Sequence, residues 1–283
     1  APDIHASCAD LLADMPKDTL DLIPAYCQMV PVRVIARLLG VPEALAPDLL
    51  RWSSAMVAMY QAGRTRAIED AANTAATEFA DFLRAYIEQR RMTPGDDLIT
   101  ELIAAQDAGG RLSPDEMIAT MVLLRNAGHE ATVHSLGNAV KCLVETETTH
   151  ALGPDSIENT VEELLRFTPP LHMFTRYAYD TIELGTLTLN PGEEIALMLG
   201  AAGRDPAVFP DPHLFNPARQ KPTHLTFGGG LHFCVGAPLA RLEMQIALPA
   251  LFDALPNLKI AQGPTFSDSY HFHKLDELMV HTS

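Results

Sequence analysis

The sequence has few cysteines and no long apolar run, and each absence excludes a class of protein. Its four cysteines are scattered over 283 residues and form no C-x-x-C pair, so a disulfide framework is not expected. The protein is therefore predicted to be reduced and cytoplasmic. No apolar segment reaches the length of a membrane span, and the first residues do not form a signal peptide.

Positive charge is also scarce. Asp and Glu number 36 against 20 Lys and Arg, which gives a net charge of −16 at pH 7. Neither nucleic acid nor an anionic membrane is expected as the main partner of such an acidic chain. Hydrophobic residues make up 47% of the sequence, which is enough for one large core.

The most informative segment is a glycine-rich loop near the C-terminus. Residues 227–236 are FGGGLHFCVG, so Cys234 ends the loop just before an amphipathic run. Pro238 suits the first turn of a helix, and the free N–H groups and dipole of that helix favour a thiolate. Glycines let the backbone approach a flat ligand closely because they lack a Cβ atom. The segment predicts a thiolate ligand for a soft metal, with haem iron as one candidate.

Two other interpretations of this loop are a phosphate-binding loop and a buried structural cysteine. A phosphate loop has Lys-Ser/Thr after its glycines and lies in a βαβ unit, and the sequence has neither feature. A structural cysteine does not explain why Phe, His and three glycines accompany it.

The loop resembles the cysteine loop of the cytochrome P-450 family, the haem-thiolate monooxygenases. The matching residues are Phe227, Gly228, Gly230, His232, Cys234 and Gly236. The resemblance implies a mainly α fold with small β-sheets (α+β), of which the chain covers only the C-terminal part. About a hundred residues are expected to be absent at the front. A fragment, an unseen front and a naturally short protein are the three explanations.

The resemblance also implies how one haem-binding domain is organised over residues 1–283. Lid and packing helices are expected over 1–112, a long central helix over 113–145, and a helix pair, hairpins, meander and Cys loop over 146–283. Periodicity predicts the helices 20–39, 43–60, 64–91, 97–108 and 238–255, and short strands at 176–178, 181–184, 186–189, 194–199 and within 259–282. Ser113, Pro114 and Glu116 form a predicted capping box for the central helix. The loop 204–230 contains five prolines, Pro222 among them.

An E-x-x-R pair precedes the Pro169-Pro170 turn. Glu163 and Arg166 share a helix face and are commonly no more than a surface ion pair. The context resembles the family's E-x-x-R pair, which braces the meander, so a structural role is expected. The family's third partner, an arginine, would fall at Leu214, and His213 or Arg219 could replace it.

The segment 126–132 resembles the oxygen-binding part of the family's central helix. Ala127 and Gly128 would leave room for dioxygen or for a kink. Glu130 matches the acid that delivers protons. Ala131 stands where the family usually has threonine, and Thr132 lies one position on, about 100° around the helix. Some family members with alanine here use a substrate hydroxyl and ordered water instead.

The remaining candidates lie around the expected haem. His232 and Arg176 match residues that pair with haem propionates in the family. The segment Leu171, His172, Met173 and Phe174 is expected to line the substrate, as are Met56, Met59, Tyr60, Ser269 and Tyr270, although core packing explains the methionines equally well. His271 and His273 form a weak candidate metal pair, because no further ligand lies near them in the sequence.

The resemblance implies an enzyme that uses haem b to insert one oxygen atom of O2 into a small hydrophobic substrate. Electrons would come from NAD(P)H through a reductase and a ferredoxin, because the chain has no flavin or nicotinamide fingerprint. Ala131, Leu214 and the absent front favour an alternative, a catalytically impaired or non-enzymatic haem binder. A peroxide-driven peroxygenase is the third interpretation.

Overall fold

Apolar residues at helical spacing place most of the chain in helices. The structure, a computed structural model, describes residues 1–61, 63–109, 112–220 and 223–282, and Pro222 lies outside them. The α-helices of the described ranges are α1 (Pro2–Ala13), α2 (Met29–Leu39), α3 (Ala46–Val57), α4 (Arg66–Met92), α5 (Leu98–Asp107), α6 (Pro114–Ala127), α7 (Glu130–Glu145), α8 (Ile157–Phe167), α9 (Leu199–Ala202) and α10 (Ala237–Ala254). None of them is both long enough and apolar enough to cross a bilayer.

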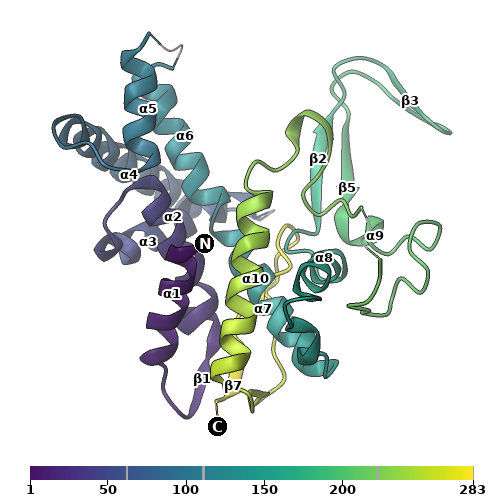
Figure 1. The fold of residues 1–283 in the computed structure, drawn as a ribbon. Helices are drawn as coiled ribbons and strands as arrows, with labels where there is room; N and C mark the ends of the chain where they lie inside the picture. The colour runs from purple at the N-terminus through teal and green to yellow at the C-terminus, as the bar shows by residue number, and fades with distance from the viewer. Residues whose placement is uncertain (62, 110–111, 221–222, 283) are drawn as a thin grey trace.

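The strands are short and pair in small antiparallel sheets. They are β1 (Thr19–Asp21), β2 (Met173–Tyr177), β3 (Ile182–Leu184), β4 (Leu187–Leu189), β5 (Glu194–Met198), β6 (Lys259–Ile260) and β7 (Met279–His281). β7 lies between β1 and β6, β2 pairs with β5, and β3 pairs with β4. Figure 1 shows β3 at the end of an arm that extends away from the helices.

Two hydrophobic clusters hold the helices together. One cluster joins α1, α7, α8 and α10 through residues such as Leu136 and Leu248. The other joins α2 to α6 through residues such as Phe79 and Met121. In Figure 1, α3 to α6 gather at the upper left, whereas α7, α8 and α10 lie at the centre. The junction of α6 and α7 therefore lies where the two clusters meet.

The predicted central helix over 113–145 is divided in two. Its capping box is confirmed: Glu116 N donates to Ser113 Oγ at 3.2 Å, and Ser113 N donates to a Glu116 carboxylate oxygen at 2.8 Å. A two-residue turn at Gly128 and His129 then separates α6 from α7. Gly128 caps α6 by donating to Leu124 O, and α7 restarts with bonds from Thr132 N and Val133 N to His129 O. The break falls at the small residues that allowed a kink.

The single helix predicted over 20–39 is wrong in its first part. Thr19–Asp21 is strand β1, and Leu20 lies opposite Val280 of β7. A π-helical turn, Ile23–Cys27, then precedes α2. Pairing with the far end of the chain overrides the local helical pattern here, because sheet hydrogen bonds and burial outweigh intrinsic propensity.

Candidate functional site

The loop before α10 holds its cysteine in a defined position. Cys234 N donates to Phe227 O at 3.0 Å, which closes the loop on itself. Gly228 and Gly230 have φ values of 73° and 66°, in the left-handed region that favours glycine. α10 begins three residues after Cys234, with proline in its first turn. Cys234 is a free and exposed thiol, whereas the other three cysteines are free and buried.

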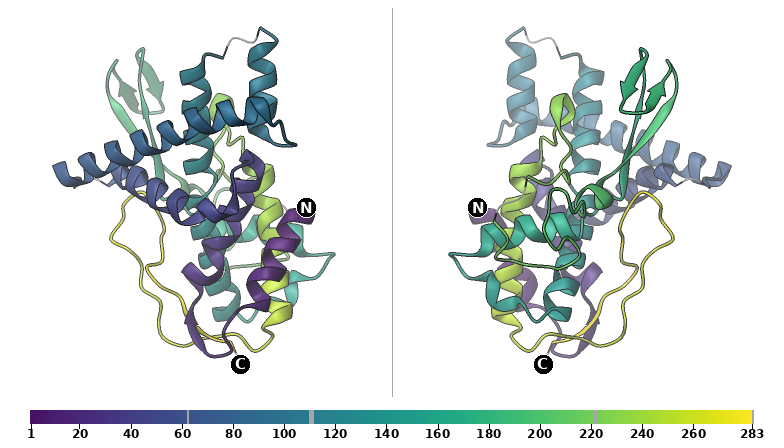
Figure 2. Two further views of the ribbon diagram at one scale, coloured as in Figure 1. Left: turned by 90° about the vertical axis from the view of Figure 1, so that its left-hand side faces the viewer. Right: turned by 90° about the vertical axis from the view of Figure 1, so that its right-hand side faces the viewer.

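Large apolar side chains next to this thiol in the sequence are exposed, as are two residues of α6. Leu231 and Val235 are 95% and 85% exposed, and Phe233 is 52% exposed. Leu123 of α6 is 63% exposed, and Ala127 at the end of that helix is also exposed. Figure 1 and Figure 2 both show the loop before α10 close to α6. Clustered exposed apolar residues of this kind mark a binding surface.

The start of α7 carries a buried acid between two histidines. Glu130 lies 3.3 Å from His134 Nε2 and 3.9 Å from His129 Nδ1, measured to its carboxylate oxygens. Burial raises the pKa of Glu130, but the His134 contact and the positive charges around the acid outweigh burial and lower that pKa to about 2. Burial and the nearby Arg125 lower the pKa of His129 to about 3. Ala131 is half-buried, and Thr132 is buried.

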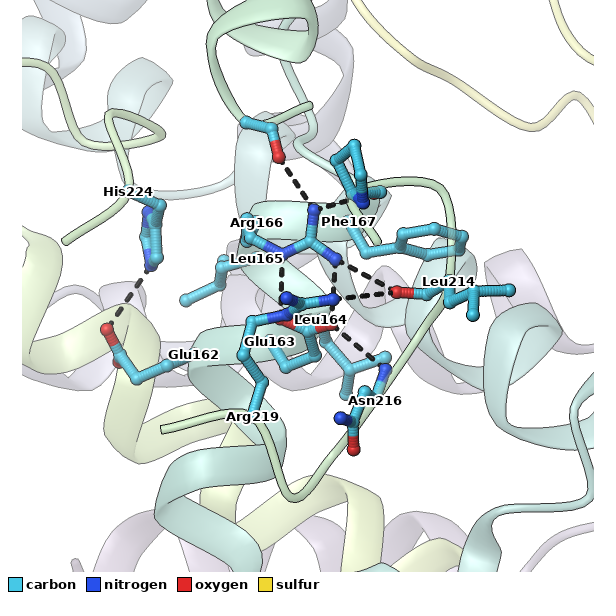
Figure 3. Close-up of polar contacts among 12 residues, drawn as sticks. Glu162, Glu163, Leu164, Leu165, Arg166, Phe167, Leu214, Asn216, Arg219 and His224 are labelled. Atoms are coloured by element: carbon cyan, nitrogen blue, oxygen red, sulfur yellow. Dashed lines mark hydrogen bonds and ion pairs between the residues drawn. The ribbon is translucent and has the colours of Figure 1, made fainter. Parts of the chain in front are cut away.

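The E-x-x-R pair is wholly buried and forms a bidentate ion pair (Figure 3). Arg166 Nε and Nη2 donate to the two carboxylate oxygens of Glu163, each at 2.7 Å. The same guanidinium donates to the carbonyl oxygens of Gly203 and Pro212, and at 3.2 Å to that of Leu214. One side chain of α8 thus ties together three points of the meander, as expected for a structural role.

Arg219 supplies the third member of this network. Its Nε lies 3.1 Å from both oxygens of Glu163, and its Nη2 donates to Leu214 O at 3.2 Å (Figure 3). Leu214 contributes its carbonyl oxygen to both arginines. Of the two substitutes that the sequence left open, His213 and Arg219, the structure selects Arg219.

A second acid of α8 was not predicted from the sequence. Glu162 receives Arg241 Nε at 2.6 Å and lies 3.2 Å from His224 Nε2. Burial raises the pKa of Glu162, but the contacts with His224 and Arg241 outweigh it and lower the pKa to about 2. The Arg241 guanidinium also lies 4.6 Å from the ring centroid of Phe227. Glu162 therefore joins α8 to α10 and to the cysteine loop, and its position next to Glu163 was the only sequence signal.

The residues predicted to line the substrate meet around one histidine. The Tyr60 ring stacks on His271 at 4.9 Å between centroids, and the Phe174 ring meets His271 edge-on at 5.9 Å. Leu171 forms a bridge with Phe272 of the same C-terminal segment. Tyr270 lies next to His271, with ring centroids 6.3 Å apart. Tyr60, β2 and the C-terminal segment thus converge here.

The other candidates of this region have separate surroundings. His172 lies 5.2 Å from His273 between ring centroids, and burial lowers the pKa of His172. Asn126 Nδ2 lies 3.6 Å from Met56 Sδ, which joins the end of α6 to α3. Met173 opens β2 opposite Met198, and Ser269 Oγ accepts from Phe272 N.

The two candidate propionate partners are free of carboxylate contacts within the described residues. His232 and Arg176 are both exposed, and neither pairs with a carboxylate in the part of the chain that the structure describes. Arg176 donates to Thr175 O and lies over the Phe174 ring.

His271 and His273 each stack on an aromatic ring, and the described residues contain no group of three potential metal ligands. A metal site at that pair is therefore not supported.

Comparisons with known proteins identify the family. The sequence profile described as Cytochrome P450 matches residues 156–269. The chain is 38% identical over 264 residues to the 6-deoxyerythronolide B hydroxylase of Saccharopolyspora erythraea and 34% identical over 268 residues to the biotin biosynthesis cytochrome P450 of Bacillus subtilis. The matches cover 92% and 93% of this chain. The chain belongs to the cytochrome P450 family. It spans 64% of the length of the hydroxylase and 68% of the length of the biotin protein.

Solved structures of the family share the fold. The crystal structure of P450BioI in complex with hexadec-9Z-enoic acid ligated acyl carrier protein matches with a TM-score of 0.94 at 33% identity, over 100% of this chain and 74% of that chain. Ligand-free CYP164A2 of Mycobacterium smegmatis matches at 0.92 and 37% identity, over 99% and 74%. The predicted P450 fold, mainly α with small sheets, is confirmed.

Membership of the P450 family implies haem as the cofactor, and the residues present fit it. A flat apolar macrocycle would cover the exposed Leu123, Leu231 and Val235. A Cβ built at Gly229 or Gly230 meets no atom within 4 Å, so this edge of the loop presents bare backbone. An exposed thiol among these groups provides the soft ligand that haem iron accepts.

Proposed function

We propose that the protein is a haem-thiolate monooxygenase that inserts one oxygen atom of O2 into a small hydrophobic substrate. The exposed thiol of Cys234 carries the proposal, because it lies behind a glycine loop, at the start of a helix and among uncovered apolar side chains. Cys234 would hold the haem iron through its thiolate, and Phe227, Gly228 and Gly236 shape its loop. Ala127 and Gly128 are the proposed small residues that leave room for dioxygen, and they lie at the turn between α6 and α7.

The proposed cofactor is haem b. Covalent attachment uses a C-x-x-C-H sequence, which this chain does not contain. His232 and Arg176 are the proposed propionate partners, since both are exposed side chains with N–H donors and no carboxylate partner in the described ranges.

The chemistry divides between the cofactor and the chain. Haem, when bound, supplies the activation of dioxygen. The chain would exclude water through the apolar residues of the Cys234 loop once haem covers them, and it holds a carboxylate, Glu130, beside the turn at Gly128 and His129. Glu163 and Arg166 act by holding the meander, so their role is structural. Ala131 and Thr132 stay predictions for the oxygen-binding segment.

For the substrate and the electron donor, we propose a class of molecule and a class of protein. An acyl chain on a carrier protein is bound in the P450BioI complex, and a 6-deoxyerythronolide B hydroxylase is a relative, so an apolar organic molecule is the proposed substrate class. Leu171, His172, Met173 and Phe174 are its proposed contacts. A ferredoxin-type donor fed by NAD(P)H supplies the electrons, and a cytoplasmic location agrees with four free cysteines.

A carbon-monoxide difference spectrum on the reduced protein tests the proposal, with haem quantified per chain. The wild-type chain is expected to give the thiolate-type Soret band, and Cys234→Ser is expected to abolish it. An unchanged band in Cys234→Ser contradicts the assignment of the ligand.

Turnover with ferredoxin against turnover with hydrogen peroxide separates the monooxygenase from a peroxygenase. Haem binding without turnover in either assay supports the impaired haem binder. Arg219 removes one argument for that alternative, because it completes the network despite Leu214.

A further inference from the structure

We propose that His134 is a positioning residue that acts through Glu130 and supplies the proton that the missing hydroxyl at Ala131 cannot relay. This inference rests on the proposed monooxygenase function. Glu130 and His134 are one helical turn apart on α7, so their side chains lie on one face of the helix. His134 Nε2 lies 3.3 Å from a carboxylate oxygen of Glu130, with the two side chains 3% and 12% exposed.

The imidazole is held in this position by the C-terminal segment. The Phe272 ring meets His134 edge-on, with ring centroids 5.3 Å apart. One turn further along α7, Asn138 Nδ2 donates to His273 O at 2.7 Å and so ties that segment to the helix. His134 Nε2 is buried and makes no well-directed hydrogen bond within the described ranges, and it lies 3.3 Å from the Glu130 carboxylate.

Glu130 needs a proton from a neighbour, because its environment keeps it ionised. The groups that face it are Arg125 of α6, His129 of the turn before α7, His134 of α7, and Lys274 of the C-terminal segment. Together the histidines and Lys274 outweigh burial and lower the pKa of Glu130 to about 2, so at neutral pH the carboxylate has no proton to give.

His134 is the neighbour best suited to supply that proton. Arg125 holds its protons too firmly to act as a donor. His129 has a pKa of about 3 and is therefore neutral at physiological pH. His134 is the neighbour whose ring nitrogen reaches the acid directly, with Nε2 3.3 Å from a carboxylate oxygen of Glu130. In the transfer, the Nε2–H bond breaks and an O–H bond forms on Glu130, which leaves a neutral imidazole. The imidazole regains its proton from solvent, which reaches the exposed Lys274 of the adjacent segment.

His134→Gln is the test variant, since an amide keeps a polar side chain but cannot titrate. We expect the ratio of product to NADPH consumed to fall at least about tenfold at neutral pH, with the lost electrons appearing as hydrogen peroxide, because a positioned acid speeds proton transfer by about 10²-fold or more and the uncoupled reaction competes with the slowed step. The pH dependence of that ratio should disappear. Ala131→Thr added to His134→Gln should restore coupling, because it returns a hydroxyl to the relay.

His224→Gln is the matched control. His224 is equally buried and lies 3.2 Å from a carboxylate oxygen of Glu162, far from Glu130 in sequence. Replacing His224 can change haem retention, but it should leave the pH dependence of the ratio of product to NADPH consumed unchanged. Coupling in His134→Gln that keeps the wild-type value and pH profile overturns the proposal.

A second measurement does not depend on turnover. Histidine NMR, on the diamagnetic ferrous carbon-monoxide form or on the haem-free chain if haem does not bind, follows the His134 ring resonances. Glu130→Gln should shift these resonances, because Nε2 loses its contact with the carboxylate. Ring resonances of His134 unmoved by Glu130→Gln refute the pairing. Failure of the proposed function would appear separately, as a wild-type chain without the thiolate carbon-monoxide band.

Discussion

At the scale of single residues, the buried charges of α8 show how ion pairs hold this fold. Glu163 is fully buried, and its charge is balanced by Arg166 and by Arg219. The two arginines extend that balance to backbone carbonyls between residues 203 and 214. A segment with little regular structure is therefore fixed by side chains of one helix and one loop.

Replacing Arg166 by Ala should destabilise the protein by about 3–5 kcal/mol. Glu163 would keep a buried negative charge and would lose the bidentate Arg166 partner, with only Arg219 left to balance it. Urea unfolding measures the loss. Arg84→Ala is the control, since Arg84 and Asp81 have the same i, i+3 arrangement at the surface, and about 0–1 kcal/mol is expected there. A stable, haem-loaded Arg166→Ala protein with slow turnover would point instead to a catalytic role.

Glu243 of α10 is a buried acid without such compensation. It is 1% exposed, and burial raises its pKa to about 8. The unfolded chain ionises near pH 4.5, so between pH 4.5 and 8 the folded state binds the extra proton and stability falls as pH rises, by up to about 1.4 kcal/mol per pH unit. Glu243→Gln should therefore stabilise the protein, most strongly near pH 8. Thermal unfolding at pH 5 and pH 8 checks this, with the exposed Glu101→Gln as control; equal effects at both pH values would contradict it.

At the scale of elements, the sequence predicts what depends on neighbouring residues. Three local signals predict what lies at their own positions. The capping box at Ser113 predicts the start of α6, the small residues predict the place of the helix break, and the glycines before Cys234 predict the turn of the loop. Strand β1 was missed because Leu20 pairs with Val280, which no local pattern can indicate. Arg219 could be named only as an alternative to His213, since its contact with Glu163 spans 56 positions. His224 was missed for the same reason, because its partner Glu162 is brought close by folding. His134 lies four positions after Glu130, so their i, i+4 spacing was a local signal that the sequence did offer.

The break between α6 and α7 has a cause at the same scale. α6 packs in the cluster that contains Met121, and α7 packs in the cluster that contains Leu136. A single straight helix would have to pack its apolar side chains into both clusters while keeping one direction. The turn at Gly128 and His129 lets each helix follow its own cluster, and it leaves Ala127 exposed.

At the scale of the whole molecule, the apolar surface around Cys234 couples cofactor binding to stability. Exposed side chains such as Leu231 and Val235 favour self-association, because contiguous apolar surface is rarely tolerated by monomers. A ligand that covers them and binds only the folded state stabilises the fold by mass action.

Adding haem to the haem-free chain should therefore lower its apparent mass by light scattering and raise its thermal midpoint. At a haem concentration 100 times the dissociation constant, the gain is about 2.7 kcal/mol. Cys234→Ser, which removes the proposed iron ligand but keeps the apolar surface, should show a smaller rise at the same haem concentration. Leu231→Asp is the complementary variant: it should reduce self-association of the haem-free chain while leaving the thiol in place. If haem leaves both the mass and the midpoint of the wild-type chain unchanged, the apolar surface is not the haem site, and the fit of this chain to the cofactor fails.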